Sequence, residues 1–281
     1  MAEDMVWRVY GGRELIPTPF LIVGILNVTP DSFFDGGRYH RPDRAISHAK
    51  DMVAQGAHII DIGGESTRPF SERVREEEEK RRVIPVIRAV ADEVPEVVIS
   101  VDTYKGAVAR EALEAGALIV NDVSGCRFDP SLLEVIAEYR PGYVLMHSLG
   151  RPEEMQKDPR YDNVVDEILY FFEERMKVLV DAGLDEENIV LDPGIGFGKL
   201  LEHNLQILRE IDRFYELGRP IFMGLSNKSL WEKLLGLKVG EREYATQVAT
   251  AILAMRGVLI HRVHNVKLTR DSLEIVRALN E

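Results

Sequence analysis

Acidic and amide side chains follow several of the short apolar runs in this chain, among them Asp102, Asn121 and Asp192. A carboxylate accepts two parallel hydrogen bonds, which suits a flat heterocycle with a 2-amino-N–H edge, such as a pterin or guanine. Asp and Asn also cap helices and form turns, so any one of these residues alone is weak evidence. The whole set, gathered at the ends of neighbouring strands, favours a ligand site.

Cationic side chains follow other apolar runs: Arg68, Lys228, Arg262 and His264. Guanidinium and ammonium groups suit phosphate oxygens, and Asn27 supplies an oxygen ligand for a Mg²⁺ ion shared with phosphates. Together, these residue types describe a flat polar ring attached to a phosphate-type leaving group. No Ser/His or Cys/His nucleophilic pair is apparent among them.

Eight apolar runs, most of them rich in Val and Ile, alternate with amphipathic stretches, and we interpret the runs as buried parallel strands. The predicted strands are 20–25, 58–62, 97–101, 118–120, 143–146, 189–191, 221–223 and 259–263. The predicted helices are 43–55, 74–93, 105–115, 130–139, 164–182, 201–217, 228–256 (broken near 236–240) and 269–279. Eight strand–helix units predict an α/β fold, a closed (β/α)₈ TIM barrel. A doubly wound open sheet is less favoured, because no Gly-x-Gly-x-x-Gly follows the first run.

The length and net charge of the chain limit its possible domain organisation and binding partners. The 281 residues are predicted to form a single domain, with an N-terminal extension over 1–19 at the barrel bottom and the barrel over 20–281. The net charge of −12 argues against broad nucleic-acid binding. No apolar run has the length of a membrane span, and the acidic start lacks a secretory pattern, so we expect a cytoplasmic protein. The single cysteine, Cys126, excludes an internal disulfide framework.

From about residue 20 to its end, the chain resembles the dihydropteroate synthase family. The matching segments are 27–37 (Asn-Val-Thr-Pro-Asp-Ser-Phe-Phe-Asp-Gly-Gly), 61–69 (Asp-Ile-Gly-Gly-Glu-Ser-Thr-Arg-Pro), 100–103 (Ser-Val-Asp-Thr), 121–125 (Asn-Asp-Val-Ser-Gly), 146–147 (Met-His), 192–199 (Asp-Pro-Gly-Ile-Gly-Phe-Gly-Lys) and 262–264 (Arg-Val-His). The resemblance implies a barrel enzyme, usually a homodimer. This transferase of folate biosynthesis joins 6-hydroxymethyl-7,8-dihydropterin diphosphate to p-aminobenzoate and releases 7,8-dihydropteroate and pyrophosphate.

The same resemblance implies roles for individual positions. It assigns Asn27 to Mg²⁺ and diphosphate. It assigns the pterin to Asp102, Asn121, Asp192 and Lys228. Arg262 would stack on the ring and hold the diphosphate with His264, and Val263, which lies between them in the motif, would also contact substrate. Residues near p-aminobenzoate would be Thr67, Arg68, Phe197 and Ser226. The implied catalytic residues are Lys228, Arg262, His264 and Arg68.

Three positions depart from the common family pattern. Asn227 stands where Ser-Arg-Lys-Ser is usual, Phe70 follows Arg-Pro in place of glycine, and Asn265 replaces a frequent aspartate. Asn227 is similar to an asparagine of the methyltetrahydrofolate:corrinoid methyltransferases. One alternative is therefore a pterin-binding methyltransferase with a corrinoid partner, and another is a non-catalytic pterin-binding homologue. The two long loop motifs and the Arg262–His264 pair favour the synthase.

Overall fold

Eight parallel strands form the barrel in the computed structural model, which describes residues 5–29, 41–66, 71 and 73–280. The strands are β3 (Leu21–Asn27), β4 (Ile59–Gly63), β5 (Val98–Asp102), β6 (Ile119–Asp122), β7 (Gly142–Met146), β8 (Ile189–Asp192), β9 (Phe222–Met223) and β10 (Ile260–Val263). They pair in the order β8-β7-β6-β5-β4-β3-β10-β9. A single bridge between Leu191 and Ile221 joins the two outer strands, so the sheet nearly closes on itself. The predicted TIM barrel is confirmed, and every strand lies within two residues of its predicted range.

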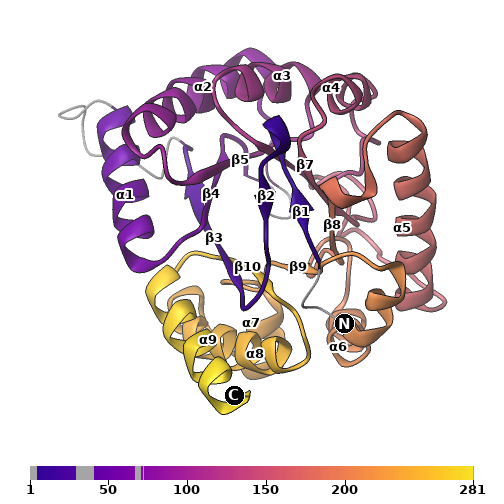
Figure 1. The fold of residues 1–281 in the computed structure, drawn as a ribbon. Coiled ribbons are helices and arrows are strands. Elements are labelled where there is room, and N and C mark those ends of the chain that lie inside the picture. The colour runs from indigo at the N-terminus through magenta and orange to yellow at the C-terminus, as the bar shows by residue number, and fades with distance from the viewer. Residues whose placement is uncertain (1–4, 30–40, 67–70, 72, 281) are drawn as a thin grey trace.

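The helices surround the strands as an outer ring (Figure 1). They are α1 (Arg41–Gln55), α2 (Glu76–Glu93), α3 (Gly106–Glu114), α4 (Ser131–Tyr139), α5 (Val164–Asp181), α6 (Leu201–Arg209), α7 (Leu230–Leu235), α8 (Glu243–Met255) and α9 (Val266–Asn280). The predicted helix 201–217 divides into α6 and a 3₁₀ turn over Ile211–Leu217. The predicted break in 228–256 is confirmed, because Gly236 ends α7 with a φ of 73°. In the described part of the chain, every helix is too short or too polar to span a bilayer.

Alternation along the strands separates two apolar layers. Side chains that point outward, such as Ile60 and Ile62 of β4, pack against the helices in the main core. Side chains that point inward at the N-terminal ends of the strands form a second cluster, which includes Val23, Ile59 and Ile260. Because both faces of each strand are buried there, the strands appear in the sequence as continuous apolar runs.

A short antiparallel hairpin, β1 (Trp7–Arg8) and β2 (Glu14–Leu15), lies across one end of the barrel (Figure 1). Trp7 and Val9 are fully buried and belong to the inner apolar cluster. The Trp7 indole donates a hydrogen bond to the Asn188 carbonyl at 2.8 Å, and the Arg219 guanidinium donates one to the Val6 carbonyl at 3.1 Å. The hairpin therefore covers the N-terminal ends of the strands and leaves the C-terminal ends as the face where polar side chains can meet a ligand.

Replacing Trp7 with alanine should lower the free energy of unfolding by about 3–5 kcal/mol, because it removes a large side chain from the inner apolar cluster. Trp7→Phe should cost less, since it keeps the ring contacts and loses the hydrogen bond to Asn188. Urea unfolding of the two variants and the wild type measures both effects. A loss below about 1 kcal/mol for Trp7→Ala would show that the hairpin does not support the barrel.

Candidate active site

The inner face of the barrel changes from apolar to polar within two residues on four of the eight strands. Ile59 is followed by Asp61, Ile119 by Asn121, Val190 by Asp192 and Ile260 by Arg262, each pair on one strand. Because side chains point to the same face at every second residue, each polar member lies above its apolar partner on the inside of the barrel. Asp102 follows Val98 on the same face, four residues later. The strands therefore build a polar layer on top of the apolar one.

A cavity of about 490 Å³ opens above this polar layer. Asp102 and Arg262 contribute to its lining from the strands, and Asn27 does so from the end of β3. The remaining lining residues come from strand ends and the loops that follow them: Ile25, Thr29, Glu65, Ser66, Met155, Gly196, Phe197, Gly224, Ser226, Asn227, Lys228, Ser229, Val239, Arg242 and His264. Most of the residues that the sequence singled out therefore meet at one cavity.

The Arg262 guanidinium is held between two carboxylates. Its Nε donates to Asp61 Oδ2 at 2.6 Å, and its Nη2 donates to Asp102 Oδ2 at 2.7 Å. Asn121 Nδ2 donates to the same Asp61 oxygen at 2.9 Å. Four strands, β10, β4, β5 and β6, are thus tied together by one hydrogen-bonded group that reaches across β3. Because two carboxylates face a single guanidinium, Arg262 fixes and partly neutralises the acidic layer.

Burial shifts the pKa values of the acids in this layer. Burial raises the pKa of Asp102 to about 7, an effect that Arg262 opposes and that the nearby Asp61 reinforces. Burial also raises the pKa of Asp192, while the Gly194 N–H and the charges of Lys228 and Lys199 lower it. Gly194 N–H donates to Asp192 Oδ1 at 2.7 Å. Acidic groups with shifted pKa values at or directly below a cavity are typical of a functional site.

Lys228 faces the aromatic ring of Phe197. Its Nζ lies 4.1 Å from the ring centroid, within the range of a cation–π interaction. Desolvation lowers the pKa of Lys228 to about 8, while Asp192 and Asp102 favour the charged form and Arg262 disfavours it. Lys228 is therefore charged at neutral pH and close to losing its proton.

The loop that carries Phe197 is held by a buried lysine. Lys199 Nζ donates to the carbonyls of Gly194 at 2.9 Å and Phe197 at 3.1 Å, and it lies 3.0 Å from His147 Nδ1. Gly194 has a φ of 68°, and a Cβ there would lie 1.9 Å from the His147 carbonyl oxygen, so only glycine fits. His147 itself is buried in this contact, away from the cavity lining.

Ser226 and His264 form a pair that the sequence did not reveal. Their Oγ and Nδ1 atoms lie 2.9 Å apart, and the His264 N–H also approaches Ser226 Oγ at 3.3 Å. The expectation that no Ser/His pair stands at the mouth is therefore wrong, because residues 38 positions apart meet at the ends of adjacent strands. His264 is exposed and lines the cavity beside Ser226.

The structure places the other predicted residues as follows. Asn121 and Asp192 are buried in the polar layer and do not line the cavity. The Val263 side chain points away from the cavity into the core against the helices, because it alternates with its two neighbours in the motif. The expectation that the Val263 side chain contacts substrate is therefore wrong. Thr67 and Arg68 lie outside the described residues.

Two of the three family departures have a local structural explanation. Asn227 has a φ of 59°, a left-handed conformation that asparagine adopts more readily than most residues, and its carbonyl accepts a hydrogen bond from Arg242 at 3.0 Å. Asn265 caps α9, since its Oδ1 accepts from the Leu268 N–H at 3.1 Å. Phe70 lies outside the described residues.

Sequence reasoning missed two residues of this site. Asp61 was absorbed into an apolar run, although its spacing of two from Ile59 placed it on the inner face. Arg242 is buried at the start of α8 and contacts Asn227, Leu237 and Glu232, which holds the loop after β9 beside the cavity. No motif marked Arg242 in the sequence.

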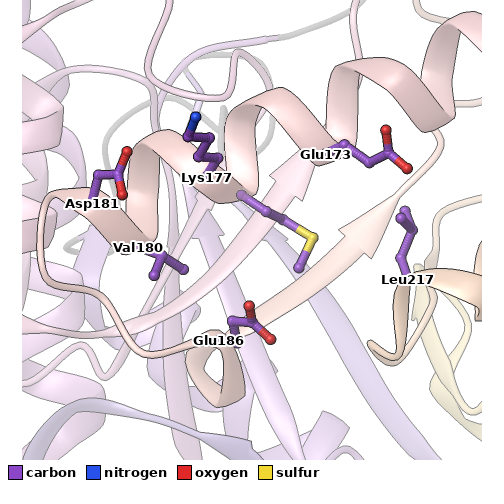
Figure 2. Close-up of a pocket in the computed structure, with 7 residues that line it drawn as sticks. Glu173, Lys177, Val180, Asp181, Glu186 and Leu217 are labelled. Carbon is purple, nitrogen blue, oxygen red and sulfur yellow. The ribbon is translucent and has the colours of Figure 1, made fainter.

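A second cavity, of about 310 Å³, lies on the outer side of the barrel (Figure 2). Glu173, Met176, Lys177, Val180 and Asp181 line it from α5. Glu186 and Leu217 complete it from two 3₁₀ turns. None of the residues singled out by the sequence contributes to it, so the chemistry belongs to the cavity inside the barrel.

Comparisons with known proteins agree with this geometry. The family model described as pterin binding enzyme matches residues 23–264. The dihydropteroate synthase of Bacillus subtilis is 47% identical over 88% of this chain and 84% of its own length. The crystal structure of Yersinia pestis dihydropteroate synthase with a sulfonamide drug complex matches with a TM-score of 0.92 and 40% identity, over 98% of this chain and 99% of that chain.

A third protein has been solved with a ligand that contains both a pterin and an aminobenzoate half. Xanthomonas albilineans dihydropteroate synthase in complex with 7,8-dihydropteroate matches with a TM-score of 0.86 and 39% identity, over 97% of this chain and 98% of that chain. The family model covers most of the sequence, and these relatives match nearly all of it. The chain therefore belongs to the dihydropteroate synthase family of pterin-binding enzymes, with the transferase activity of that family.

Proposed function

We propose that this chain condenses 6-hydroxymethyl-7,8-dihydropterin diphosphate with p-aminobenzoate, giving 7,8-dihydropteroate and pyrophosphate. The observation that carries the proposal is the arrangement of charges along the barrel axis. A buried acidic layer lies inside the barrel, and Lys228 and His264 line the cavity at the C-terminal ends of the strands. A flat ring that donates hydrogen bonds fits the acidic layer, and a diphosphate fits the cationic groups. A methyl donor carries no diphosphate, which favours the synthase over the methyltransferase alternative.

The acidic layer would bind the pterin edge. Asp192 and Asp102 supply carboxylate oxygens, and Asn121 supplies an amide beside them. Arg262 holds Asp102 in place and offers its guanidinium as a flat surface for the ring, because it also lines the cavity. Asp102, Asn121 and Arg262 belong to one hydrogen-bonded group with Asp61, and Asp192 is held by the Gly194 N–H. The groups are therefore in place before any ligand binds, which reduces the entropy lost on binding.

The reaction itself requires loss of diphosphate from the pterin methylene carbon. The electrons of the C–O bond leave with the diphosphate, and the cation that remains is delocalised into the ring. We assign His264 and Lys228, which both line the cavity, to the leaving group, whose negative charge they would stabilise. The amine of p-aminobenzoate then attacks the methylene carbon and loses a proton, so no covalent enzyme intermediate through Ser226 is needed. Phe197 and Ser226 lie beside this acceptor position, and we assign Thr67 and Arg68 to it by family resemblance alone.

A Mg²⁺ ion fits the chemistry at Asn27. Mg²⁺ binds hard oxygen ligands and commonly keeps several waters, with one or two protein oxygens and substrate phosphates completing its shell. The Asn27 amide lines the cavity at the end of β3. Among the described residues, no group of three or more His, Cys, Asp or Glu side chains forms a complete metal cage, which suits an ion shared with the diphosphate. When bound, the ion would neutralise charge on the leaving group.

The test of the proposed function is a turnover assay with Mg²⁺, the pterin diphosphate and p-aminobenzoate. We expect dihydropteroate and pyrophosphate to appear in equal amounts. Pterin binding without product would exclude the synthase and leave the binding-only homologue. Methyl transfer from methyltetrahydrofolate to a corrinoid, again without dihydropteroate, would establish the methyltransferase.

The pKa values of Asp102 and Lys228 predict a narrow pH optimum. Asp102 is ionised only above about pH 7, and Lys228 keeps its charge only below about pH 8. The value of kcat/KM for the pterin diphosphate should therefore be highest between these values and fall by up to roughly tenfold per pH unit on either side. Lys228→Arg should move the alkaline limb upward, because a guanidinium stays charged. A flat profile from pH 6 to 9 would contradict these roles.

We also propose a homodimer, with α8 at its interface. Tyr244, Val248, Ile252 and Met255 are each more than half exposed, and their spacing of four, four and three places them on one face of α8. Three further apolar residues, Leu268, Ile275 and Leu279, are exposed on α9, which packs beside α8. Exposed apolar side chains gathered on one helix face are typical of a face that another protein covers. A second copy of the chain is the occupant that the family resemblance implies.

Ile252→Glu should convert the protein to a monomer, because it introduces a charge in the middle of the α8 face. Tyr170→Glu is the matched control, since Tyr170 is as exposed as the α8 residues and belongs to α5, which lies away from α8 in the ring of helices (Figure 1). Analytical ultracentrifugation of the wild type and both variants gives the masses in solution. A wild type that sediments as a monomer would exclude the dimer.

A further inference from the structure

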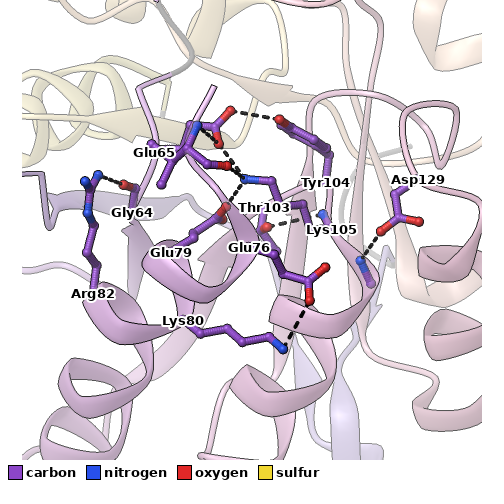
Figure 3. A network of polar contacts seen from close by, with 12 residues as sticks. Gly64, Glu65, Glu76, Glu79, Lys80, Arg82, Thr103, Tyr104, Lys105 and Asp129 are labelled. Atoms are coloured by element: carbon purple, nitrogen blue, oxygen red, sulfur yellow. Dashed lines mark hydrogen bonds and ion pairs between the residues drawn. The ribbon is translucent and has the colours of Figure 1, made fainter. Parts of the chain in front are cut away.

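A buried cation, Lys105, lies just after β5 and links three segments of the chain (Figure 3). Its side chain is 3% exposed. Its Nζ donates to Glu65 Oε2 at 2.5 Å, to the Val74 carbonyl at 2.8 Å and to Glu79 of α2. An ammonium has three donors, and these three contacts use all of them. The geometry of Lys105 is therefore fully determined by its partners.

Glu65 is held just as closely from the other side. Tyr104 donates its hydroxyl to Glu65 Oε1 at 2.9 Å, and the Val74 N–H donates to Glu65 Oε2 at 3.0 Å. Val74 is therefore bound at both its N–H, by Glu65, and its carbonyl, by Lys105. Since Glu65 lies near the start of the connection between β4 and α2 and Val74 lies near its end, the cluster fixes the chain close to both ends of this connection.

Stability alone is a poor explanation for this cluster. Burying one cation and two carboxylates carries a large desolvation penalty, and apolar residues of similar size in place of buried ion pairs are often neutral or stabilising. Burial raises the pKa of Glu79, although Lys105 opposes the shift. The raised pKa is a sign of the desolvation penalty in this cluster. What the charges supply that apolar residues would not is a defined position for the backbone at Val74 and for the Glu65 side chain.

The cluster borders the cavity inside the barrel. Glu65 and Ser66 line that cavity, and Asp102 lies three residues before Lys105. Ser71 donates its hydroxyl to the Ser66 carbonyl at 2.5 Å, which draws the two sides of the connection together next to the cavity. The contacts of Lys105 therefore determine where Glu65 and Ser66 stand at the cavity wall.

We propose that Lys105 is a positioning residue for the aminobenzoate side of the site, acting through Val74 and through Glu65, which lines the cavity. The inference rests on the proposed function, because it takes p-aminobenzoate as the acceptor. Lys105 touches neither substrate. The pterin depends on the polar layer held by Arg262, which has no hydrogen bond to the Lys105 cluster among the described residues. Loss of Lys105 therefore impairs acceptor binding and spares the pterin.

The first test is Lys105→Met, which keeps the length of the side chain and removes its charge and donors. We expect KM for p-aminobenzoate to rise about tenfold or more, while KM for the pterin diphosphate changes by less than about twofold. The matched control is Lys50→Met, which breaks an exposed ion pair with Glu93 and should leave both values unchanged. Equal losses for the two substrates would overturn the inference.

A second variant separates positioning from stability. Lys105→Met combined with Glu79→Leu removes one cation and one carboxylate, so the net charge of the cluster stays the same and the buried charges are fewer. Thermal unfolding should show its stability recovered relative to Lys105→Met, while KM for p-aminobenzoate stays raised because Val74 and Glu65 still lack the ammonium. If KM returns to the wild-type value together with stability, Lys105 is merely structural. If Lys105→Met does not fold, the inference is tested by KM for p-aminobenzoate in the double variant alone.

Equilibrium binding gives a measure that does not depend on turnover. The affinity of the double variant for 7,8-dihydropteroate, which contains the aminobenzoate half, should fall about tenfold, while its affinity for 6-hydroxymethyl-7,8-dihydropterin stays within about twofold of the wild type. Unchanged affinity for both ligands would overturn the inference while leaving the proposed function intact. A wild type that forms no dihydropteroate would overturn the proposed function, and the inference with it.

Discussion

The Arg262 guanidinium between Asp61 and Asp102 is the interaction on which the active site depends. A buried carboxylate is costly unless it is paired and hydrogen-bonded, and this barrel places two of them on adjacent strands. Arg262 compensates both, and Asn121 shares the Asp61 oxygen. The polar layer is therefore rigid before any ligand binds. Removing Arg262 would leave two buried carboxylates without their cationic partner, which is more damaging than losing the contacts themselves.

The rest of the fold serves to keep this layer at one depth in the barrel. The apolar cluster below it, closed by the N-terminal hairpin with Trp7, excludes water from the lower half of the interior. Above it, Lys199 fixes the Phe197 loop, and Arg242 holds the loop that carries Asn227. The strands supply precise positions for the acids, while loops anchored by buried cations supply the groups that face the leaving group and the acceptor. This division matches the general rule that barrel chemistry lies at the C-terminal ends of the strands.

The sequence predicted the strands well, because buried parallel strands are continuous apolar runs and their ends are marked by polar residues. It therefore also located Asp102, Asn121, Asp192 and Arg262, which end or nearly end their strands. Asp61 was missed because it sits inside an apolar run, where only the alternation of faces distinguishes it. The same alternation turns Val263 away from the cavity, although its motif neighbours face it.

The sequence could not predict contacts between distant segments of the chain. Ser226 and His264 meet only because their strands are adjacent in the barrel, and the contacts of Lys105 to Glu65 and Glu79 join residues from consecutive strand–helix units. Side chains of this kind carry no local motif, since their partners are set by the packing of the whole barrel. The departures at Asn227 and Asn265 were visible in the sequence, but their backbone and capping roles needed the structure.

The most direct test of the central interaction is the pterin affinity of an Asp61→Asn variant. The control is Asp122→Asn, since Asp122 is as deeply buried on a nearby strand and instead binds Ser124, Cys126 and Tyr143. Calorimetry with 6-hydroxymethyl-7,8-dihydropterin should show an affinity loss of about tenfold or more for Asp61→Asn and little change for the folded Asp122→Asn protein. Asp61 does not line the cavity, so a loss of affinity would have to act through Arg262. Unchanged affinity in Asp61→Asn would contradict the claim that Arg262 and its two carboxylates organise the site.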